Sequence, residues 1–393
     1  NIIPKRYKEL GLSELDTYFS MARGYQGEHG DVKALAMKKW FNTNYHYIVP
    51  EVEDDTQIKL SGDKLWNEYD EAEELGIVTK PMITGAYTML KLCRYTGNKS
   101  AADYVDDIVK AYKELLQTCG KKQIAWVQFD EPALVLDMSD EDKKLFHEIY
   151  DELLACSTDT KILLQTYFGD IRDIYEDVIK MSFAGIGIDF IEGKQSYELV
   201  SKFGFPKDKV LFAGLVNGKN IWKNHYDKTL KIVNELADKG IDTVISTSCS
   251  LLHVPYTLGN EEKLSKEYTA YFSFAKEKLV ELNELGKLAD KKNYCDDEVY
   301  KKNHELFNGN RNCTNANVSE RLSKVKEDDY IRLPKRSERQ KLQKEEFKLP
   351  ELPTTTIGSF PQTKDVKANR SAFKRGEKTE QEYIEFNKKK IAE

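Results

Sequence analysis

The chain has 393 residues, enough for two ordinary domains or for one large barrel with additions. Hydrophobic residues make up 40% and charged residues 32%, and the net charge of −6 gives no sign of a nucleic-acid binder or a polyanion trap. The six cysteines are irregularly spaced without a CxxC pair, so we expect reduced thiols and a cytoplasmic location. The sequence contains neither an apolar run of the roughly 18 residues that span a membrane nor an N-terminal secretion signal.

Six short apolar segments are spaced between residues 81 and 248. Each is almost continuously apolar, which is typical of strands covered on both faces of a parallel sheet. The predicted strands are 81–85, 124–130, 161–166, 185–190, 209–214 and 242–248. The segments between them are amphipathic, and 101–118, 140–155 and 229–239 carry apolar residues at helical spacing. Strands and helices therefore alternate as in parallel βαβ units.

Two architectures satisfy this alternation, a doubly wound sheet and a (β/α)8 barrel. No GxGxxG motif follows the first strand, and a doubly wound sheet would concentrate its polar residues at one switch point. Polar residues instead follow nearly every strand, namely Asp130, Glu131, Thr166, Asp189, Asn217 and Ser248. A barrel builds its site from many strand ends, so we predict an α/β fold of the (β/α)8, or TIM, type.

Six strands are two fewer than such a barrel needs. The aromatic segment 38–52 is expected to supply at most one extended piece, so we expect the first strands to lie before Asn1. The predicted domains are a barrel truncated at its start over residues 1–290, a charged helical linker over 291–350, and the beginning of a second domain over 351–393. The first domain is expected to end in a long helix over 261–290, and the last to open with an apolar strand at 352–361.

Two adjacent carboxylates, Asp130 and Glu131, end one predicted strand and are followed by Pro132. At a barrel mouth such a pair can bind amines or serve as acid and base. The same residues can equally form a hydrogen-bonded turn, and the sequence leaves both interpretations open.

The segment 39–47 interleaves aromatic rings with asparagines and Lys39. Its rings could stack on a flat heterocycle while Lys39 pairs with an anionic tail. An aromatic plug of the core is the simpler interpretation of the same composition.

Cys249 and His253 are four residues apart after the last predicted strand, a spacing that invites a metal or a nucleophile interpretation. Zinc would need further ligands, and the Thr-Tyr-Phe segment 166–168 at another strand end offers none. Near the end of the chain, Gly358 and Ser359 follow an apolar run, and their backbone N–H groups could bind a carboxylate; an ordinary turn explains them as well.

Long segments of the chain resemble the cobalamin-independent methionine synthase family. They are Lys-Trp-Phe-Asn-Thr-Asn-Tyr-His-Tyr at 39–47, Val-Gln-Phe-Asp-Glu-Pro-Ala-Leu at 127–134, Gly-Leu-Val-Asn-Gly-Lys-Asn-Ile-Trp at 214–222, Ser-Cys-Ser-Leu-Leu-His at 248–253 and Leu-Pro-Thr-Thr-Thr-Ile-Gly-Ser-Phe-Pro-Gln-Thr at 352–363. The resemblance implies two face-to-face (β/α)8 barrels that move a methyl group from 5-methyltetrahydropteroyl-oligoglutamate to homocysteine. It also implies a zinc ion in the C-terminal barrel, which favours the homocysteine thiolate.

The same resemblance implies roles for a few residues. Lys39 matches a lysine that contacts the glutamate tail of the folate, and Ile357, Gly358 and Ser359 match the segment that holds homocysteine. The family's zinc ligands and catalytic His lie in a part of the second barrel that is absent from this sequence. We therefore expect no catalytic residue and no bound cofactor here, and a chain that is inactive alone and partners a C-terminal catalytic barrel. Among the strand ends that correspond to the zinc ligands only Cys249 keeps a ligand type, which predicts no zinc in the first domain.

Two other functions stay open. One is a self-sufficient barrel hydrolase or lyase that uses Asp130 and Glu131, with Asn217 and Cys249 as further polar residues of the barrel mouth. The other is a non-catalytic scaffold barrel, which an exposed apolar patch near the strand ends would favour.

Overall fold

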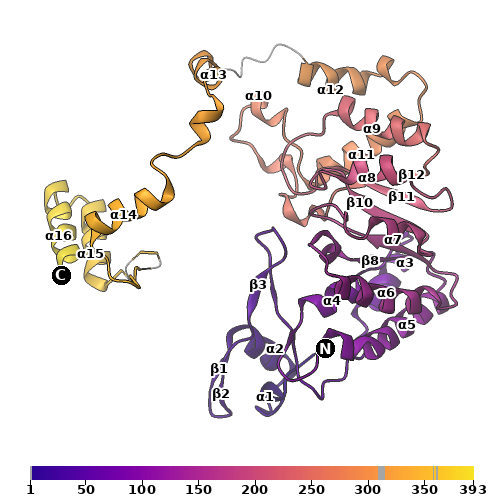
Figure 1. The fold of residues 1–393 in the computed structure, drawn as a ribbon, viewed down its shortest axis with the longest axis horizontal. Coiled ribbons are helices and arrows are strands. Elements are labelled where there is room, and N and C mark those ends of the chain that lie inside the picture. Colours follow the sequence, from indigo (N-terminus) through magenta and orange to yellow (C-terminus); the bar gives the residue numbers. More distant parts are fainter. Residues whose placement is uncertain (1, 309–314, 357, 360–361) are drawn as a thin grey trace. The chain divides into compact units, whose positions relative to one another are not determined.

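The computed structural model describes residues 2–308, 315–356, 358–359 and 362–393 (Figure 1). Packing divides the chain into two compact units, Asn1–Asn310 and Arg311–Glu393. The first unit extends beyond residue 290 because helix α12 (Glu298–Asn308) packs on helix α9 (Tyr226–Asp238). Asn303 of α12 anchors this contact, since its Oδ1 accepts a hydrogen bond from the Tyr226 N–H at 2.9 Å.

Six parallel strands form the central sheet of the first unit, in the order β12-β11-β10-β9-β8-β6. They are β6 (Met82–Thr84), β8 (Trp126–Asp130), β9 (Lys161–Gln165), β10 (Gly185–Asp189), β11 (Val210–Val216) and β12 (Thr243–Thr247). All six predicted strands are confirmed. Because every pairing is parallel, their carboxyl ends meet along one edge of the sheet. In the described residues β6 and β12 are the outer strands and do not pair with each other, so the fold is α/β with a parallel sheet.

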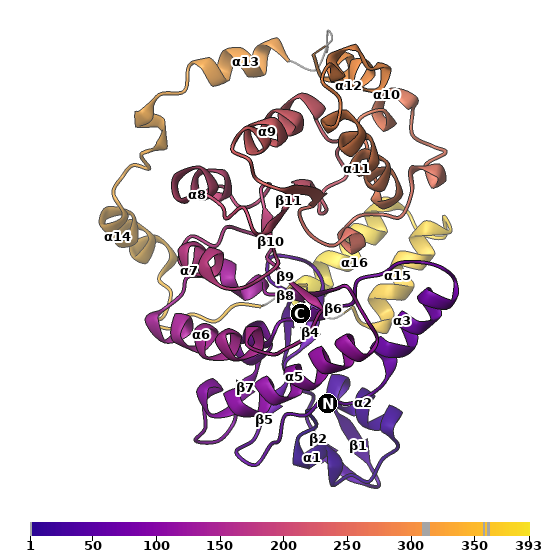
Figure 2. The ribbon, with the colours of Figure 1, turned by 90° about the vertical axis from the view of Figure 1, so that its right-hand side faces the viewer.

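Helices succeed one another around the outer side of this sheet (Figure 2). They are α4 (Ala86–Leu92), α5 (Val105–Lys121), α6 (Asp140–Leu154), α7 (Tyr175–Lys180), α8 (Ser196–Phe203), α9 and α11 (Ala275–Ala289), with short 3-10 turns at Ala101–Tyr104 and Pro132–Val135. The helices predicted at 101–118, 140–155 and 229–239 are confirmed to within a few residues. The core lies between the two layers, where Ile108 and Leu116 of α5 join Val127 and Phe129 of β8 in one buried cluster.

The prediction of one long helix over residues 261–290 is wrong for the first half of that range. This segment forms the helix α11, preceded by the short α10 (Lys266–Thr269), and 3-10 turns lie at Leu251–His253, Leu258–Asn260 and Tyr294–Asp296. Between α10 and α11 the backbone groups form hydrogen bonds with the loop after β11 and do not continue a helix. The Ser273 N–H donates to the Ile221 carbonyl at 2.7 Å, and the Lys223 N–H donates to the Tyr271 carbonyl at 2.8 Å. Tertiary hydrogen bonds thus override the helical spacing of the apolar residues.

The described residues before β6 form small elements outside the central sheet. They are α1 (Lys5–Lys8), α2 (Glu14–Arg23), the antiparallel pair β1 (Tyr25–Gly27) and β2 (Gly30–Val32), the antiparallel pair β3 (Met37–Lys39) and β4 (His46–Ile48), β5 (Glu51–Val52) and α3 (Lys64–Glu74). β5 pairs with β7 (Arg94–Tyr95). The segment 38–52 is therefore extended in part, as predicted. Its strands form the β3–β4 hairpin and the β5–β7 pair, and both lie outside the central sheet.

The second unit is helical in its described residues. Its helices are α13 (Ala316–Ser323), α14 (Arg336–Phe347), α15 (Lys364–Lys374) and α16 (Glu380–Ala392), with a 3-10 turn at Glu327–Tyr330. α15 and α16 pack through Phe373 and Tyr383, whose rings stack with centroids 4.7 Å apart. The strand predicted at 352–361 is not formed by residues 352–356 and 358–359, and its other residues lie outside the described ones. A strand needs a neighbour for its backbone groups, and the described part of this unit offers none.

Within the described ranges, every helix is too short or too polar to traverse a bilayer. The five cysteines of these ranges are free thiols.

Candidate functional site

Glu131 faces the outer helices. Its carboxylate accepts hydrogen bonds from the backbone N–H groups of Tyr87 (2.9 Å) and Thr88 (2.7 Å) in the first turn of α4, and from the Tyr150 hydroxyl of α6 (2.5 Å). Desolvation of this fully buried side chain raises its pKa to about 7. Gly85 allows the approach, because a Cβ there would lie 2.2 Å from the carboxylate. Glu131 therefore caps a helix, and the prediction that it lines a barrel mouth is corrected to the hydrogen-bonded turn.

Asp130 points to the opposite side of β8, because neighbouring residues of a strand alternate. Its Oδ1 accepts a hydrogen bond from Gln128 Nε2 at 2.7 Å. Burial raises the pKa of Asp130 to about 6, and Gln128, the Tyr167 hydroxyl and the Lys80 ammonium oppose that rise. The two adjacent carboxylates are thus held on different faces by different partners, and they cannot act on one substrate as an acid and base pair.

Asp189 at the end of β10 fixes two neighbouring loops. It accepts hydrogen bonds from the N–H groups of Phe168 (2.9 Å), Ile191 (2.7 Å) and Glu192 (2.9 Å). Its pKa is raised to about 6 by burial, which these hydrogen bonds oppose. Phe168 has φ 73°, a left-handed conformation that costs a non-glycine residue roughly 1 kcal/mol or more, so Asp189 helps to hold a strained backbone.

The tip of the β3–β4 hairpin packs on these strand ends. Trp40 and Phe41 cluster with Tyr167, Phe168 and Cys249, which follow β9 and β12. The rings of Phe41 and Phe168 lie 6.2 Å apart. The tip of the segment 39–47 therefore packs as an aromatic plug, which is the simpler of the two interpretations of its sequence.

Cys249 lies in a cluster with Tyr167 and Phe168, and burial raises the pKa of its thiol to about 12. His253 lies against aromatic rings, with centroids 5.2 Å from Tyr45 and 5.6 Å from Phe168. Among the described residues, no three His, Cys, Asp or Glu side chains converge to hold a metal ion. The described residues around Cys249 and His253 offer no further zinc ligands.

A polar bridge adds a directional contact at the same place. Asn42 of the hairpin tip donates from Nδ2 to Glu192 Oε2 at 2.7 Å, and its Oδ1 accepts from Lys219 Nζ at 2.8 Å. Lys219 also pairs with Glu192 Oε1 at 2.7 Å. Asn217 shapes the loop that carries Lys219, because its Oδ1 accepts from the N–H groups of Lys219 (2.9 Å) and Asn220 (3.0 Å). We call Asn42, Glu192 and Lys219 the Asn42 bridge.

Sequence reasoning missed Glu192 and Lys219 as partners of Asn42, because they lie 150 and 177 residues from it. The only local signal is the Asn-Thr-Asn turn between aromatic residues. Asn217, Cys249 and Glu131 all follow strands at the carboxyl edge of the sheet, but Glu131 faces the outer helices α4 and α6.

Lys39 lies at the end of β3, opposite His46, and is exposed. Its Nζ is 3.4 Å from Asn44 Oδ1, which is a weak contact. In the second unit, Gly358 and Ser359 are exposed and Gly358 has φ 81°, while Ile357 lies outside the described residues.

The loops that follow β10, β11 and β12 carry exposed apolar side chains. They are Ile191, Trp222, Leu252, Tyr256 and Tyr268.

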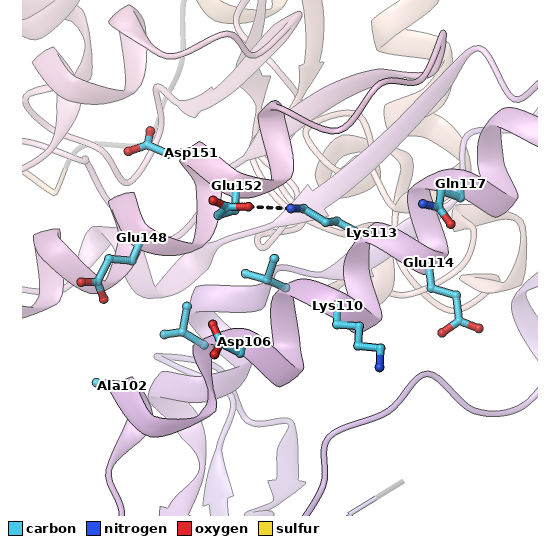
Figure 3. A pocket seen from close by; sticks show the side chains of 11 residues that line it. Ala102, Asp106, Lys110, Lys113, Glu114, Gln117, Glu148, Asp151 and Glu152 are labelled. Carbon is cyan, nitrogen blue, oxygen red and sulfur yellow. Dashed lines mark hydrogen bonds and ion pairs between the residues drawn. The ribbon is translucent and has the colours of Figure 1, made fainter.

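A separate groove runs between α5 and α6 on the outer side of the first unit (Figure 3). Lys113 and Glu152 pair across it at 2.6 Å, and Asp106 and Glu114 lie along it. Exposed ion pairs of this kind contribute about 0–1 kcal/mol, and the groove contains none of the predicted site residues.

Comparison with known proteins places this parallel α/β fold among the cobalamin-independent synthases. The family profile described as "Cobalamin-independent synthase, N-terminal domain" matches residues 1–240, and the profile described as "Cobalamin-independent synthase, Catalytic domain" matches residues 352–393. The chain belongs to the cobalamin-independent methionine synthase family, and the family predicted from the sequence is confirmed.

Curated relatives carry the name 5-methyltetrahydropteroyltriglutamate–homocysteine methyltransferase. The protein of Lactococcus lactis is 51% identical over all of this chain and 51% of its own length, and that of Campylobacter jejuni subsp. doylei is 50% identical over all of this chain and 52% of its own length. The chain therefore spans about half the length of the curated relatives it matches. A solved B12-independent methionine synthase from Shewanella aligns with 62% of this chain and 71% of its own at 15% identity and a TM-score of 0.46, too low to carry an argument.

Proposed function

We propose that the chain takes part in methyl transfer from 5-methyltetrahydropteroyltriglutamate to homocysteine, the reaction that the relatives' name describes. In this reaction the first unit contributes Lys39 as a contact for the folate's glutamate tail. The observation that carries the proposal is the exposed ammonium of Lys39, which directly precedes a hairpin tip seated on the strand ends. A lysine in such a place attracts carboxylates without first having to break a strong ion pair.

We further propose that the parallel sheet is part of a (β/α)8 barrel whose carboxyl-end loops support a catalytic barrel. The exposed apolar side chains of those loops, such as Leu252 and Tyr256, support the docking role. Residues 351–393 would begin that second barrel, with Ile357, Gly358 and Ser359 as its homocysteine-binding segment. The catalytic-domain match over residues 352–393 supports this assignment.

Zinc would supply the activation of homocysteine as a thiolate. The first unit contributes nothing to that step in this proposal, since the thiol of Cys249 is buried among aromatic rings. We also propose that the 393-residue chain is inactive alone. A methyl-transfer assay with zinc, homocysteine and methyl-folate triglutamate tests this directly, and sustained turnover by the chain alone would contradict it. Adding a separately expressed catalytic half should restore turnover if the docking role is correct.

The tail contact is tested by binding of γ-linked triglutamate to the 393-residue chain. The variant Lys39→Ala should bind about tenfold more weakly, because a charge-assisted contact contributes roughly 1.4 kcal/mol or more. Lys110→Ala on α5 is the matched control, since Lys110 is exposed but lies on the outer side of the first unit. Equal affinities of the Lys39 variant and the parent chain would refute the contact.

A further inference from the structure

We infer that the Asn42 bridge positions the β3–β4 hairpin so that Lys39 is presented to the folate tail, which makes Asn42, Glu192 and Lys219 positioning residues for tail binding. This inference rests on the proposed role of Lys39. It adds to that role the part of the structure that determines where the lysine is held.

The hairpin needs such support, because it is too small to fix its own orientation. β3 and β4 have three residues each, and an isolated two-stranded hairpin is marginally stable in water. Its tip is held by the apolar contacts of Trp40 and Phe41 and by a hydrogen bond from the Tyr45 hydroxyl to the Leu252 carbonyl at 2.6 Å. Apolar contacts have little directional preference, so they seat the tip without fixing its rotation.

The Asn42 bridge supplies contacts that depend on direction, so it can fix how the hairpin tip is turned. The single amide of Asn42 donates to one partner and accepts from the other, while those two partners pair with each other, so the three groups form a closed ring of contacts. Glu192 is carried by the loop after β10, and Lys219 by the loop after β11. The side chains of Lys219 and Glu192 are 24% and 28% exposed, which leaves their interactions only partly screened by solvent.

The loops that carry the bridge are themselves braced. Lys219 Nζ lies 5.1 Å from the ring centroid of Phe168, whose backbone N–H is held by Asp189. Asp189 also accepts from the N–H of Glu192. Both partners of Asn42 are therefore fixed with reference to the end of β10.

The Asn42 bridge also determines which lysine near the hairpin has its charge neutralised by an ion pair. Glu192 neutralises Lys219 within the ring, while the lysines of β3, Lys38 and Lys39, are exposed. An anionic tail would therefore be drawn to the hairpin strand and not to the loop after β11. Lys39 precedes Asn42 by three residues, so rotation of the tip would move its ammonium directly.

The experiment compares triglutamate binding by the 393-residue variants Asn42→Ala and Lys39→Ala across a range of salt concentrations. Asn42→Ala should bind about tenfold more weakly, since two hydrogen bonds are lost, with the salt dependence unchanged because no charge is removed. Lys39→Ala should lower both the affinity and the salt dependence. If Lys39→Ala weakens binding and Asn42→Ala does not, the positioning role is refuted while the tail contact stands. If neither variant weakens binding, both proposals fail.

Charge reversal provides a rescue that loss of packing alone would not produce. Glu192→Lys and Lys219→Glu should each weaken triglutamate binding, because each places like charges side by side around Asn42. The double variant restores an opposite pair in the reverse order, and the amide of Asn42 can turn over to donate and accept as before. Recovery of affinity to within about threefold of the parent chain is expected. Affinity in the double variant as low as in the single variants would overturn the inference.

Discussion

Glu131 and Glu192 both follow strands of the same sheet, yet the protein uses them in opposite ways. Glu131 is fully buried, accepts three hydrogen bonds and holds the outer helices α4 and α6 to β8. Glu192 is partly exposed and connects two loops to a distant hairpin. A carboxylate at a strand end is therefore not by itself a sign of chemistry. The contacts of Glu131 should control stability, and those of Glu192 should control where the hairpin lies.

The largest effect is expected from Glu131→Ala. Removal of the carboxylate leaves the N–H groups of Tyr87 and Thr88 and the Tyr150 hydroxyl buried without their acceptor. The free energy of unfolding should fall by roughly 3 kcal/mol or more. Urea unfolding followed by tryptophan fluorescence measures this in the intact chain, because all four tryptophans lie in the first unit. Glu148→Ala, which changes an exposed part of α6, should cost less than about 0.5 kcal/mol. Equal losses in the two variants would show that Glu131 has no special role.

The next effect is a loss of stability with rising pH. The pKa of Glu131 is about 7 in the folded chain against an ordinary value of 4.5, and those of Asp130 and Asp189 are about 6 against 3.8. Between pH 4 and 7 the unfolded chain releases these protons first, so its free energy falls relative to the folded chain. Their contribution is complete below pH 4, and it is lost by about pH 6–7 for Asp130 and Asp189 and by about pH 8 for Glu131.

Unfolding in urea at pH 6 and pH 7.5 should therefore differ by about 2 kcal/mol, with the first unit more stable at pH 6. Glu131→Gln should flatten the upper part of this dependence, between about pH 6 and 7.5. A stability that rises over the same interval would contradict the prediction.

The smallest effect on stability is expected from Lys219→Ala in the Asn42 bridge. Its ion pair is partly exposed, and its contact with the Phe168 ring is a surface cation–π interaction, so about 1 kcal/mol should be lost. Lys202→Ala is the matched control, because Lys202 lies 4.6 Å from the ring centroid of Phe203 without an ion pair in the described contacts. Only Lys219→Ala should shift the emission of Trp40. A loss as large as that of Glu131→Ala would erase the distinction between the roles of Glu131 and Glu192.

The regular part of the fold could be predicted from the sequence because its signals are local. The six strands are continuous apolar runs, and α5, α6 and α9 carry apolar stripes at helical spacing. The break between α10 and α11 could not, since it depends on hydrogen bonds to a loop some fifty residues earlier. The strand expected at 352–361 is absent from its described residues for a related reason, because β propensity alone supplies no partner.

The candidate site was predicted in part. The sequence placed Asn217, Asp130 and Cys249 at one edge of the sheet, and it identified 39–47 as aromatic. The alternation of side chains along β8 could have separated Asp130 from Glu131 before the structure was known. The Asn42 bridge could not have been found in this way, because two of its three members lie far along the chain from the hairpin.

Cys249 is buried in the aromatic cluster against which Trp40 and Phe41 of the hairpin tip pack, so its reactivity reports on that cluster. Its reaction with an alkylating reagent should become faster when the tip lifts from the strand ends. Cys295 is exposed and reacts at once, whereas Cys119 is buried in α5 and reacts only when the helix layer opens. The three rates, measured side by side on one chain, separate the movement of the hairpin from the unfolding of the unit that carries it.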